Sequence, residues 1–339
     1  MTRSPESNPP GIDPESLDLI EEYLAGADAA ASTLIKRRAH LIELATWLMH
    51  SRTAHPRSEA PCSIEHASPG QLHLFMGYLM SGERYAGTMR TAHTPLSASS
   101  RKGFLASLRS FYVHLVLVRV IDRDPTLGIR SPKVHVQPGF RLSPDELRRL
   151  LEATGSARDR IQTFLLVYTA ARAGELRQLL WDDIDFQQRI LILHGKNNTT
   201  HIVNIHPALM GELRLWYIHQ DQLAQRHPEV AQARQNPETN YVLMTTRGRQ
   251  LTHTAVYKQL KRRANQAGLY VLEPAHREYR SRVSPHAIRR SIATMLLNDG
   301  HPLDAVADVL NHRQVDTTRT HYAFSSPKRR RATIEAILR

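Results

Sequence analysis

Apolar residues in the first 130 positions recur with the period of amphipathic helices. In the first segment Leu17, Ile20 and Leu24 lie three to four residues apart, which places them on one face of a helix. The same period predicts helices over about residues 13–24, 29–50, 68–79 and 97–118. Because this part of the chain has no convincing strand pattern, it predicts a small helical bundle.

A change in composition marks the end of this bundle. Residues 131–139 contain two prolines and a glycine without a helical period, and so predict an extended linker. Just after them, Ser143, Pro144 and Glu146 have the sequence of a capping box with proline at the first helical position. We therefore expect a flexible N-terminus at 1–12, a helical domain at 13–130, a linker at 131–142 and a second domain at 143–339.

The second domain mixes helices with a hairpin. Two apolar runs rich in β-branched residues, 189–194 and 201–205, flank a Gly/Asn-rich turn, which is typical of a β-hairpin. Helical periods cover about residues 144–153, 157–170, 174–180, 207–225, 252–267, 285–299, 302–310 and 327–338. The expected fold class is therefore mainly α, with a small β-hairpin or sheet in the second domain.

Composition narrows the classes of function. The chain has 339 residues and is 41% hydrophobic, which excludes a wholly disordered protein. No apolar stretch approaches the roughly 18 residues of a membrane helix, and the N-terminus does not resemble a signal peptide, so we expect a cytoplasmic protein. The single cysteine, Cys62, excludes an internal disulfide and a cysteine-rich zinc site. The 19 histidines leave a histidine–carboxylate metal site open, although no His-Glu-x-x-His sequence occurs.

The net charge of the chain indicates the kind of molecule that it binds. The net charge is +13, and it is concentrated after residue 139, where 30 Lys and Arg stand against 19 Asp and Glu. A polyanion, and nucleic acid above all, is the expected partner. Basic clusters on predicted helices are candidate DNA contacts, although a solvated helix face explains each of them equally well. These candidates are Lys36, Arg37, Arg38, Arg101, Lys102, Arg109, Lys258, Lys261, Arg262 and Arg263.

Five basic or nucleophilic elements follow one another in the second domain. Arg172 lies where one predicted helix stops and the next starts, and Lys196 lies at the hairpin turn. A proline then begins a helix in which His286 and Arg289 share one face, near an N-terminus that favours anions. The last two elements are His312 and Tyr322.

This order of residues resembles the tyrosine recombinase, or phage integrase, family. The family pattern is an arginine after Thr-Gly-Leu, a lysine in a β-hairpin, His-x-x-Arg, Leu-Gly-His and a nucleophilic tyrosine. Here Ala170 and Ala171 stand in place of Gly-Leu, Asn311 replaces the glycine before His312, and the hairpin lacks a second basic residue. The resemblance implies a two-domain DNA clamp, with a helical SAM-like core-binding domain at 13–130 and a catalytic domain with a C-terminal tail helix at 143–339.

The implied activity is site-specific recombination through a 3′-phosphotyrosyl intermediate. Tyr322 would attack the phosphodiester, and Arg172 and Arg289 would clamp it, because an arginine fork suits the charge that develops on phosphate oxygens. The resemblance makes Glu175 a carboxylate that supports these arginines. The simpler interpretation of Glu175 is an ion pair with Arg177 or a helix cap.

The remaining residues of the pattern handle protons. A phenol with a pKa near 10 needs a base or cationic surroundings, and His286 and His312 can take or hold its proton. Lys196 on the hairpin can protonate the leaving 5′ oxygen. Because the phosphotyrosyl ester keeps the bond energy, the resemblance implies no ATP, no metal and no other cofactor.

The resemblance also implies the assembly. The partners would be double-stranded DNA with inverted-repeat core sites and further copies of this chain in a tetramer, associated with the nucleoid. Ile334, Ile337 and Leu338 form an apolar stripe in the last predicted helix, which the family donates to a neighbouring protomer.

Residues 273–282 form an additional segment before the histidine motif. It contains Arg277, Arg280 and Arg282, and we expect a loop that contacts DNA or a partner. Tyr279 lies in it, but precedes the histidine motif and is not the expected nucleophile.

Two other functions fit the same residues. A type IB topoisomerase uses this chemistry on one strand, and a DNA-binding regulator could keep the clamp without catalysis. The helical first domain with its linker favours the recombinase, and no position of the catalytic pattern is lost. Taken singly, Arg172 could be a surface ion pair, His312 a helix C-cap and Tyr322 a buried aromatic residue.

Overall fold

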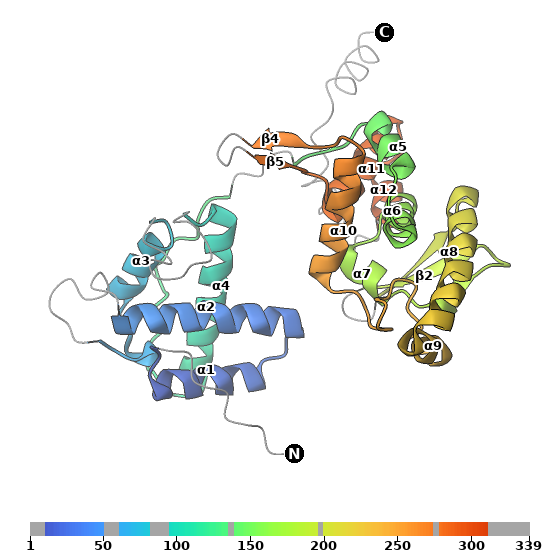
Figure 1. Ribbon diagram of the computed structural model, residues 1–339. Helices are drawn as coiled ribbons and strands as arrows, with labels where there is room; N and C mark the ends of the chain where they lie inside the picture. Colours follow the sequence, from blue (N-terminus) through green and yellow to red (C-terminus); the bar gives the residue numbers. More distant parts are fainter. Residues whose placement is uncertain are drawn as a thin grey trace, which may run out of the picture. The chain divides into compact units, whose positions relative to one another are not determined.

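The chain forms two compact units, residues 1–135 and 136–339 (Figure 1). The computed structural model describes residues 11–50, 61–81, 95–134, 139–195, 199–273 and 278–310. The boundary between the units lies inside the segment 131–142 predicted to be a linker. The end of that segment belongs to the second unit, where Leu142 is buried and its backbone N–H donates to Ser291 Oγ at 2.7 Å.

The first unit is helical, as its apolar period predicts. Its described elements are α1 (Pro14–Gly26), α2 (Ala31–His50), the 3₁₀ turn η2 (Ile64–His66), α3 (Pro69–Tyr78) and α4 (Ala98–Leu117). Local signals set several helix starts: Asp13 caps α1 through its side chain, and Ser68 forms a capping box with Gln71 at the start of α3. The four predicted helices are confirmed to within a few residues.

The core of the first unit is built from the apolar faces of these helices. Ile20, Leu44 and Phe111 are fully buried at its centre. Ile12 also packs in this core, so the segment 1–12 expected to be flexible is ordered at its end. A buried, stacked pair, His40 on Phe104 with ring centroids 3.7 Å apart, joins α2 to α4.

The second unit combines helices with two small antiparallel sheets. Its described helical elements are α5 (Pro144–Glu152), α6 (Ala157–Thr169), α7 (Ala173–Gln178), the 3₁₀ turn η3 (Trp181–Asp183), α8 (Pro207–Arg226), α9 (Pro228–Gln235), α10 (His253–Gln266), α11 (Pro285–Asn298) and α12 (Leu303–Val309). The strands are β1 (Ile184–Asp185), β2 (Ile190–His194), β3 (Thr200–Asn204), β4 (Val271–Glu273) and β5 (Glu278–Arg280). The mainly α fold with a small sheet is confirmed.

Helix α6 is the centre of the second unit, and α5, α8, α10 and α11 all pack against it. Its residues Ile161, Leu165 and Leu166 are buried in the apolar core of this unit. The predicted hairpin is the β2–β3 pair, in which Leu193 faces His201, and β1 adds a third strand beside β2. β4 and β5 pair antiparallel, and β5 lies in the segment 273–282 that the sequence predicts to be a loop.

None of the helices within the described ranges is long and apolar enough to cross a membrane. The predicted tail helix at 327–338 lies outside the described residues.

Candidate active site

A break between two helices positions Arg172. Helix α6 ends at Ala170, whose φ of 50° lies in the left-handed region, and Thr169 Oγ1 accepts a hydrogen bond from the Ala171 N–H at 3.1 Å. Arg172 then takes an extended conformation as the N-cap of α7. The chain thus reverses direction at the place where the sequence predicts that one helix stops and another starts.

Glu175 holds Arg172 in this position. Its carboxylate accepts a hydrogen bond from the Arg172 backbone N–H at 2.7 Å and another from Nη1 at 2.6 Å. The Glu175 side chain is 6% exposed, whereas that of Arg172 is 38% exposed. The buried carboxylate therefore caps the start of α7, which is one of the simpler interpretations of Glu175, and also pairs with the Arg172 guanidinium. Its support of a catalytic arginine stays a prediction.

Arg289 comes from another element and lies in the same cluster. Ser284 caps α11 by accepting a hydrogen bond from the Ala287 N–H, and Arg289 follows in the second turn. Its guanidinium, 4% exposed, donates from Nη1 to the Ala170 carbonyl at 2.7 Å and from Nη2 to the Leu310 carbonyl. One buried arginine thus brings together the end of α6, the start of α11 and the end of α12.

His286 lies at the exposed start of α11, one turn before Arg289. Partial burial lowers the pKa of its imidazole, and nearby positive charges lower that pKa further. These charges belong to Arg289, Arg290 and Arg172, with a contribution from His253. These shifts favour the neutral imidazole, the form that can accept a proton.

The hairpin turn begins beside the same cluster. A Cβ atom built on Gly195 would lie 3.6 Å from Glu175 Oε1, and the Gly195 N–H donates to the Thr199 carbonyl at 2.7 Å. Lys196 lies outside the described residues.

His312 and Tyr322 also lie outside the described residues. The described chain ends at Leu310, whose carbonyl accepts a hydrogen bond from Arg289. The structure therefore brings Arg172, Glu175, His286 and Arg289 together, while the assignment of Lys196, His312 and Tyr322 to this site remains a prediction.

The sequence analysis missed one residue of the cluster, His201 on β3. The charges of Glu175, Arg289 and Arg172 act on the pKa of its imidazole. Burial lowers the pKa of His201, and the two arginines act in the same direction. A signal was present, because alternation along the strand places this histidine on the same face as the core residue Val203.

Comparison with known proteins identifies the family. Residues 141–329, more than half of the chain, match the family model described as the phage integrase family. The chain belongs to this family, the tyrosine recombinases.

Relatives and solved structures agree with this membership. The tyrosine recombinase XerC of Myxococcus xanthus is 29% identical over 256 residues, which are 74% of this chain and 79% of that protein. The post-cleavage complex of XerH site-specific recombinase with a palindromic difH substrate is similar in fold, with a TM-score of 0.65 and 19% identity over 94% of this chain and 84% of that chain. A lambda integrase tetramer bound to a Holliday junction gives a TM-score of 0.59 and 17% identity over 90% of this chain and 76% of that chain. The protein is therefore a site-specific recombinase and a DNA-binding enzyme.

The DNA-contact candidates of the recombinase differ in their surroundings. In the first unit, α2 packs against α4, and a Cβ atom built on Gly103 would lie 3.8 Å from Lys36 Nζ, so the basic clusters of the two helices adjoin. Arg38 pairs with Glu21 at 2.6 Å, and Arg109 Nη2 donates to the Ile129 carbonyl at 2.7 Å. Contact of this cluster with DNA stays a prediction.

In the second unit, three candidates on α10 are exposed and one is not. Lys258, Lys261 and Arg262 lie three to four residues apart and share an exposed face, although Arg262 also pairs with Asp159 at 3.1 Å. Arg263 is fully buried, and for this residue the prediction of DNA contact is wrong. Its Nε donates to the Leu150 carbonyl at 2.9 Å and its Nη2 to the Leu151 carbonyl at 2.6 Å, which satisfies the C-terminal carbonyls of α5.

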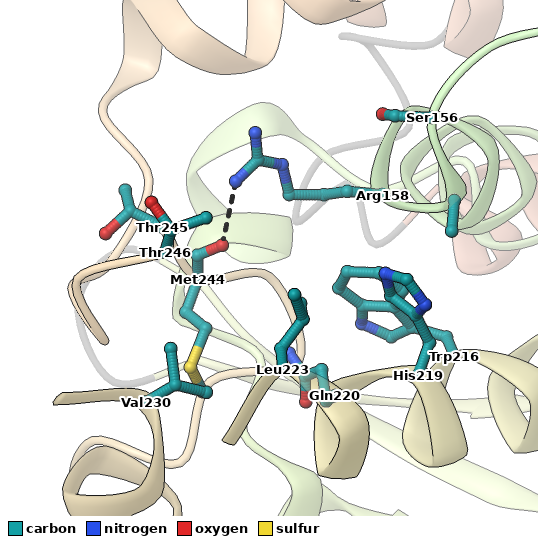
Figure 2. A pocket seen from close by; sticks show the side chains of 11 residues that line it. Ser156, Arg158, Trp216, His219, Gln220, Leu223, Val230, Met244, Thr245 and Thr246 are labelled. Atoms are coloured by element: carbon teal, nitrogen blue, oxygen red, sulfur yellow. Dashed lines mark hydrogen bonds between the residues drawn. The ribbon is translucent and has the colours of Figure 1, made fainter. Parts of the chain in front are cut away.

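A pocket of about 160 Å³ lies elsewhere in the second unit, between the start of α6, helices α8 and α9 and the turn at 244–246 (Figure 2). Arg158 crosses it and donates from Nη1 to the Met244 carbonyl at 3.2 Å, and the rings of Trp216 and His219 stack on another wall. No residue of the catalytic pattern lines this pocket. Among the described residues, no group of three or more His, Cys, Asp or Glu side chains could hold a metal ion.

Proposed function

We propose that this recombinase cleaves and rejoins DNA strands through a 3′-phosphotyrosyl intermediate formed by Tyr322. The observation that carries the proposal is the convergence of Arg172, at the start of α7, with His286 and Arg289 on α11 into one cluster with excess positive charge. Glu175 supplies one negative charge and uses it to orient Arg172. Such a cluster favours an anion, and a phosphodiester in its transition state is an anion with increased charge on its oxygens.

In the cleavage step, the phenolic oxygen of Tyr322 attacks the phosphorus atom. A bond forms between this oxygen and phosphorus, the bond from phosphorus to the 5′ oxygen breaks, and the phenolic proton passes to His286 or His312. Lys196 donates a proton to the departing 5′ oxygen. The lowered pKa of His286 favours the neutral imidazole, which supports its role as a proton acceptor.

The arginines stabilise the phosphate while these bonds change. Losing one preorganised donor to a developing charge typically costs about 10²–10³-fold in rate. Rejoining reverses the step, with a 5′ hydroxyl of the partner strand attacking the phosphotyrosyl ester. Because the ester conserves the bond energy, the reaction requires neither ATP nor a metal.

The substrate in this proposal is double-stranded DNA with inverted-repeat core sites, bound by both units as a clamp. The fold is shared with a lambda integrase tetramer on a Holliday junction, which supports recombination by a tetramer on DNA. The predicted helix at 327–338 would link neighbouring protomers. The biological task is integration, excision or resolution of a DNA element such as a mobile element, carried out where the protein associates with the nucleoid.

The test begins with the Tyr322→Phe variant, which removes the hydroxyl group but little volume. This variant selects a binding site from a randomised duplex library, and a nick is then placed in the selected site to trap the cleaved state. The unsubstituted protein should form a covalent adduct with this duplex, and Tyr322→Phe should bind it without forming one.

Tyr279→Phe is the matched control and should form the adduct normally. An adduct formed by Tyr322→Phe, or lost in Tyr279→Phe, would overturn the assignment of the nucleophile. Holliday junction formation between two selected sites separates a recombinase from a type IB topoisomerase, which would relax a plasmid without forming junctions.

A further inference from the structure

The pocket between the start of α6, helices α8 and α9 and the turn at 244–246 has an apolar inner part and a polar edge (Figure 2). Trp216, Val230 and Met244 line its inner part and are buried. Ser156 and Thr246 line its exposed edge. A concave, mostly apolar site with a few polar groups is the usual form of a small-molecule binding site.

The size and the walls of this pocket suit one flat ring. Its volume is about 160 Å³. A cavity of roughly 150 Å³ with apolar walls is large enough to hold benzene. The ring of His219 stacks on that of Trp216, with centroids 5.3 Å apart and 28° between the ring planes, and gives one wall an aromatic surface. Because aromatic rings pack well against one another, an aromatic group fits this space.

Several polar side chains around the pocket already have partners within the protein. Gln220 Nε2 and Trp216 Nε1 both donate to the Val242 carbonyl, at 3.0 Å and 2.6 Å. Ser156 Oγ accepts from the Asp159 N–H at 3.1 Å, as the N-cap of α6. These groups line the pocket without needing a ligand.

Arg158 differs from these residues, because its guanidinium is only partly paired. Its Nη1 donates to the Met244 carbonyl at 3.2 Å, whereas its Nε is buried and has no hydrogen-bond partner among the described residues. The neighbouring carboxylate of Asp159 pairs with Arg262 instead, at 3.1 Å. Burial lowers the pKa of Arg158, although a guanidinium stays charged in a protein. A half-buried cation of this kind favours an incoming anion.

We propose that this pocket binds a small aromatic carboxylate, with the ring against Trp216 and the carboxylate on Arg158. The bond from Arg158 to the Met244 carbonyl is at the long end of the usual range, and a carboxylate offers the planar guanidinium stronger, charge-assisted bonds. Ser156 and Ala157 at the start of α6 also line the pocket, and the N-terminal end of a helix favours negative charge. No step of the proposed strand cleavage depends on this site.

The experiment titrates the full-length protein with sodium benzoate and with benzyl alcohol, which has the same ring without the charge. The readout is the NMR signal of the Trp216 indole N–H, identified by its loss in Trp216→Phe. A ligand of this size binds weakly, and we expect benzoate to shift the signal saturably with a Kd of about 0.1–1 mM. Benzyl alcohol should bind about 10–100-fold more weakly, because it cannot form charged hydrogen bonds to Arg158. Acetate, a carboxylate without the ring, should not shift the signal at the same concentrations.

Arg158→Met removes the guanidinium but keeps an unbranched side chain, and should bind benzoate no more tightly than benzyl alcohol. Arg158→Lys keeps the charge without the planar fork, and its benzoate affinity should lie in between. Arg247→Met is the matched control, because Arg247 is exposed next to Thr246 and its loss changes the net charge equally. This control should keep the full preference for benzoate.

Equal affinity of the unsubstituted protein for benzoate and benzyl alcohol would overturn the inference. The absence of a saturable shift of the Trp216 signal at about 10 mM benzoate would do the same. A preference for benzoate that persists in Arg158→Met, or that disappears in Arg247→Met, would also contradict it. The comparison of the two ligands on the unsubstituted protein decides the question even if Arg158→Met does not fold.

Discussion

Replacing Glu175 with glutamine tests the cationic cluster directly. The carboxylate accepts two hydrogen bonds from Arg172, at 2.7 Å from the backbone N–H and 2.6 Å from Nη1. A hydrogen bond to a charged group contributes about 1.5–3 kcal/mol and a neutral one about 0.5–1.5 kcal/mol. Removing the charge therefore weakens the pair of bonds by about 2 kcal/mol in total. The amide NH₂ of glutamine also places donors toward the donors of Arg172, which adds to the loss.

If all of the roughly 2 kcal/mol is lost from the stabilisation of the transition state, cleavage should slow by about 30-fold, since 1.36 kcal/mol corresponds to tenfold in rate. The assay is single-turnover cleavage of the nicked duplex at saturating protein, with DNA affinity measured in parallel and expected to change little. Glu212→Gln is the matched control, because Glu212 forms a similar pair with Arg160 at 2.5 Å, near the other end of α6. A normal cleavage rate in Glu175→Gln would refute the view that this carboxylate orients a catalytic arginine.

Three further outcomes are expected. Arg263→Met should lower the free energy of unfolding by about 2–4 kcal/mol, as measured in urea, because the Leu150 and Leu151 carbonyls lose a charged donor. The salt dependence of DNA binding should stay the same in that variant, whereas Lys261→Ala should reduce the slope by about 0.9 if it contacts a phosphate. In an NMR titration of the free protein, His286 should titrate below its ordinary pKa of about 6.5. Because the folded state disfavours protonation of His286, its contribution to stability is fully present above pH 6.5 and is lost as the pH falls through the lowered pKa. A pKa of His286 above 6.5 would contradict the cationic cluster. Cleavage should survive EDTA, and loss that magnesium or zinc restores would indicate a metal-dependent nuclease.

Much of the fold follows from local signals that are readable in the sequence. Ser143 and Glu146 cap each other at the start of α5, and Pro285 is the first residue of α11, as the sequence predicts. The elements that were missed are short: α9 has eight residues and β4 and β5 have three each. So few residues carry too little periodicity to separate a helix or strand from a loop.

Arg263 shows why composition alone misassigns a basic residue. Its position on α10 shares a face with Val256 and Leu260, so the helical period already places it toward the core. Its partners are backbone carbonyls of α5, more than 100 residues earlier in the chain. No pattern of side chains reveals an acceptor of that kind, and the arginine was therefore counted with its exposed neighbours.

The same reasoning explains how the site tolerates its departures from the family pattern. Arg289 holds Ala170 and Leu310 through their backbone carbonyls, so the contact does not depend on which side chain either position carries. The family has glycine where Ala170 stands, and the φ of 50° observed there is a conformation that glycine adopts freely. Alanine adopts it at a cost of about 1–2 kcal/mol. The guanidinium that binds the Ala170 carbonyl helps to hold this strained turn, and the turn in turn sets the direction of Arg172. Arg289 and Arg172 are therefore coupled through the backbone of Ala170. The sequence alone shows this residue only as an alanine at the end of a predicted helix.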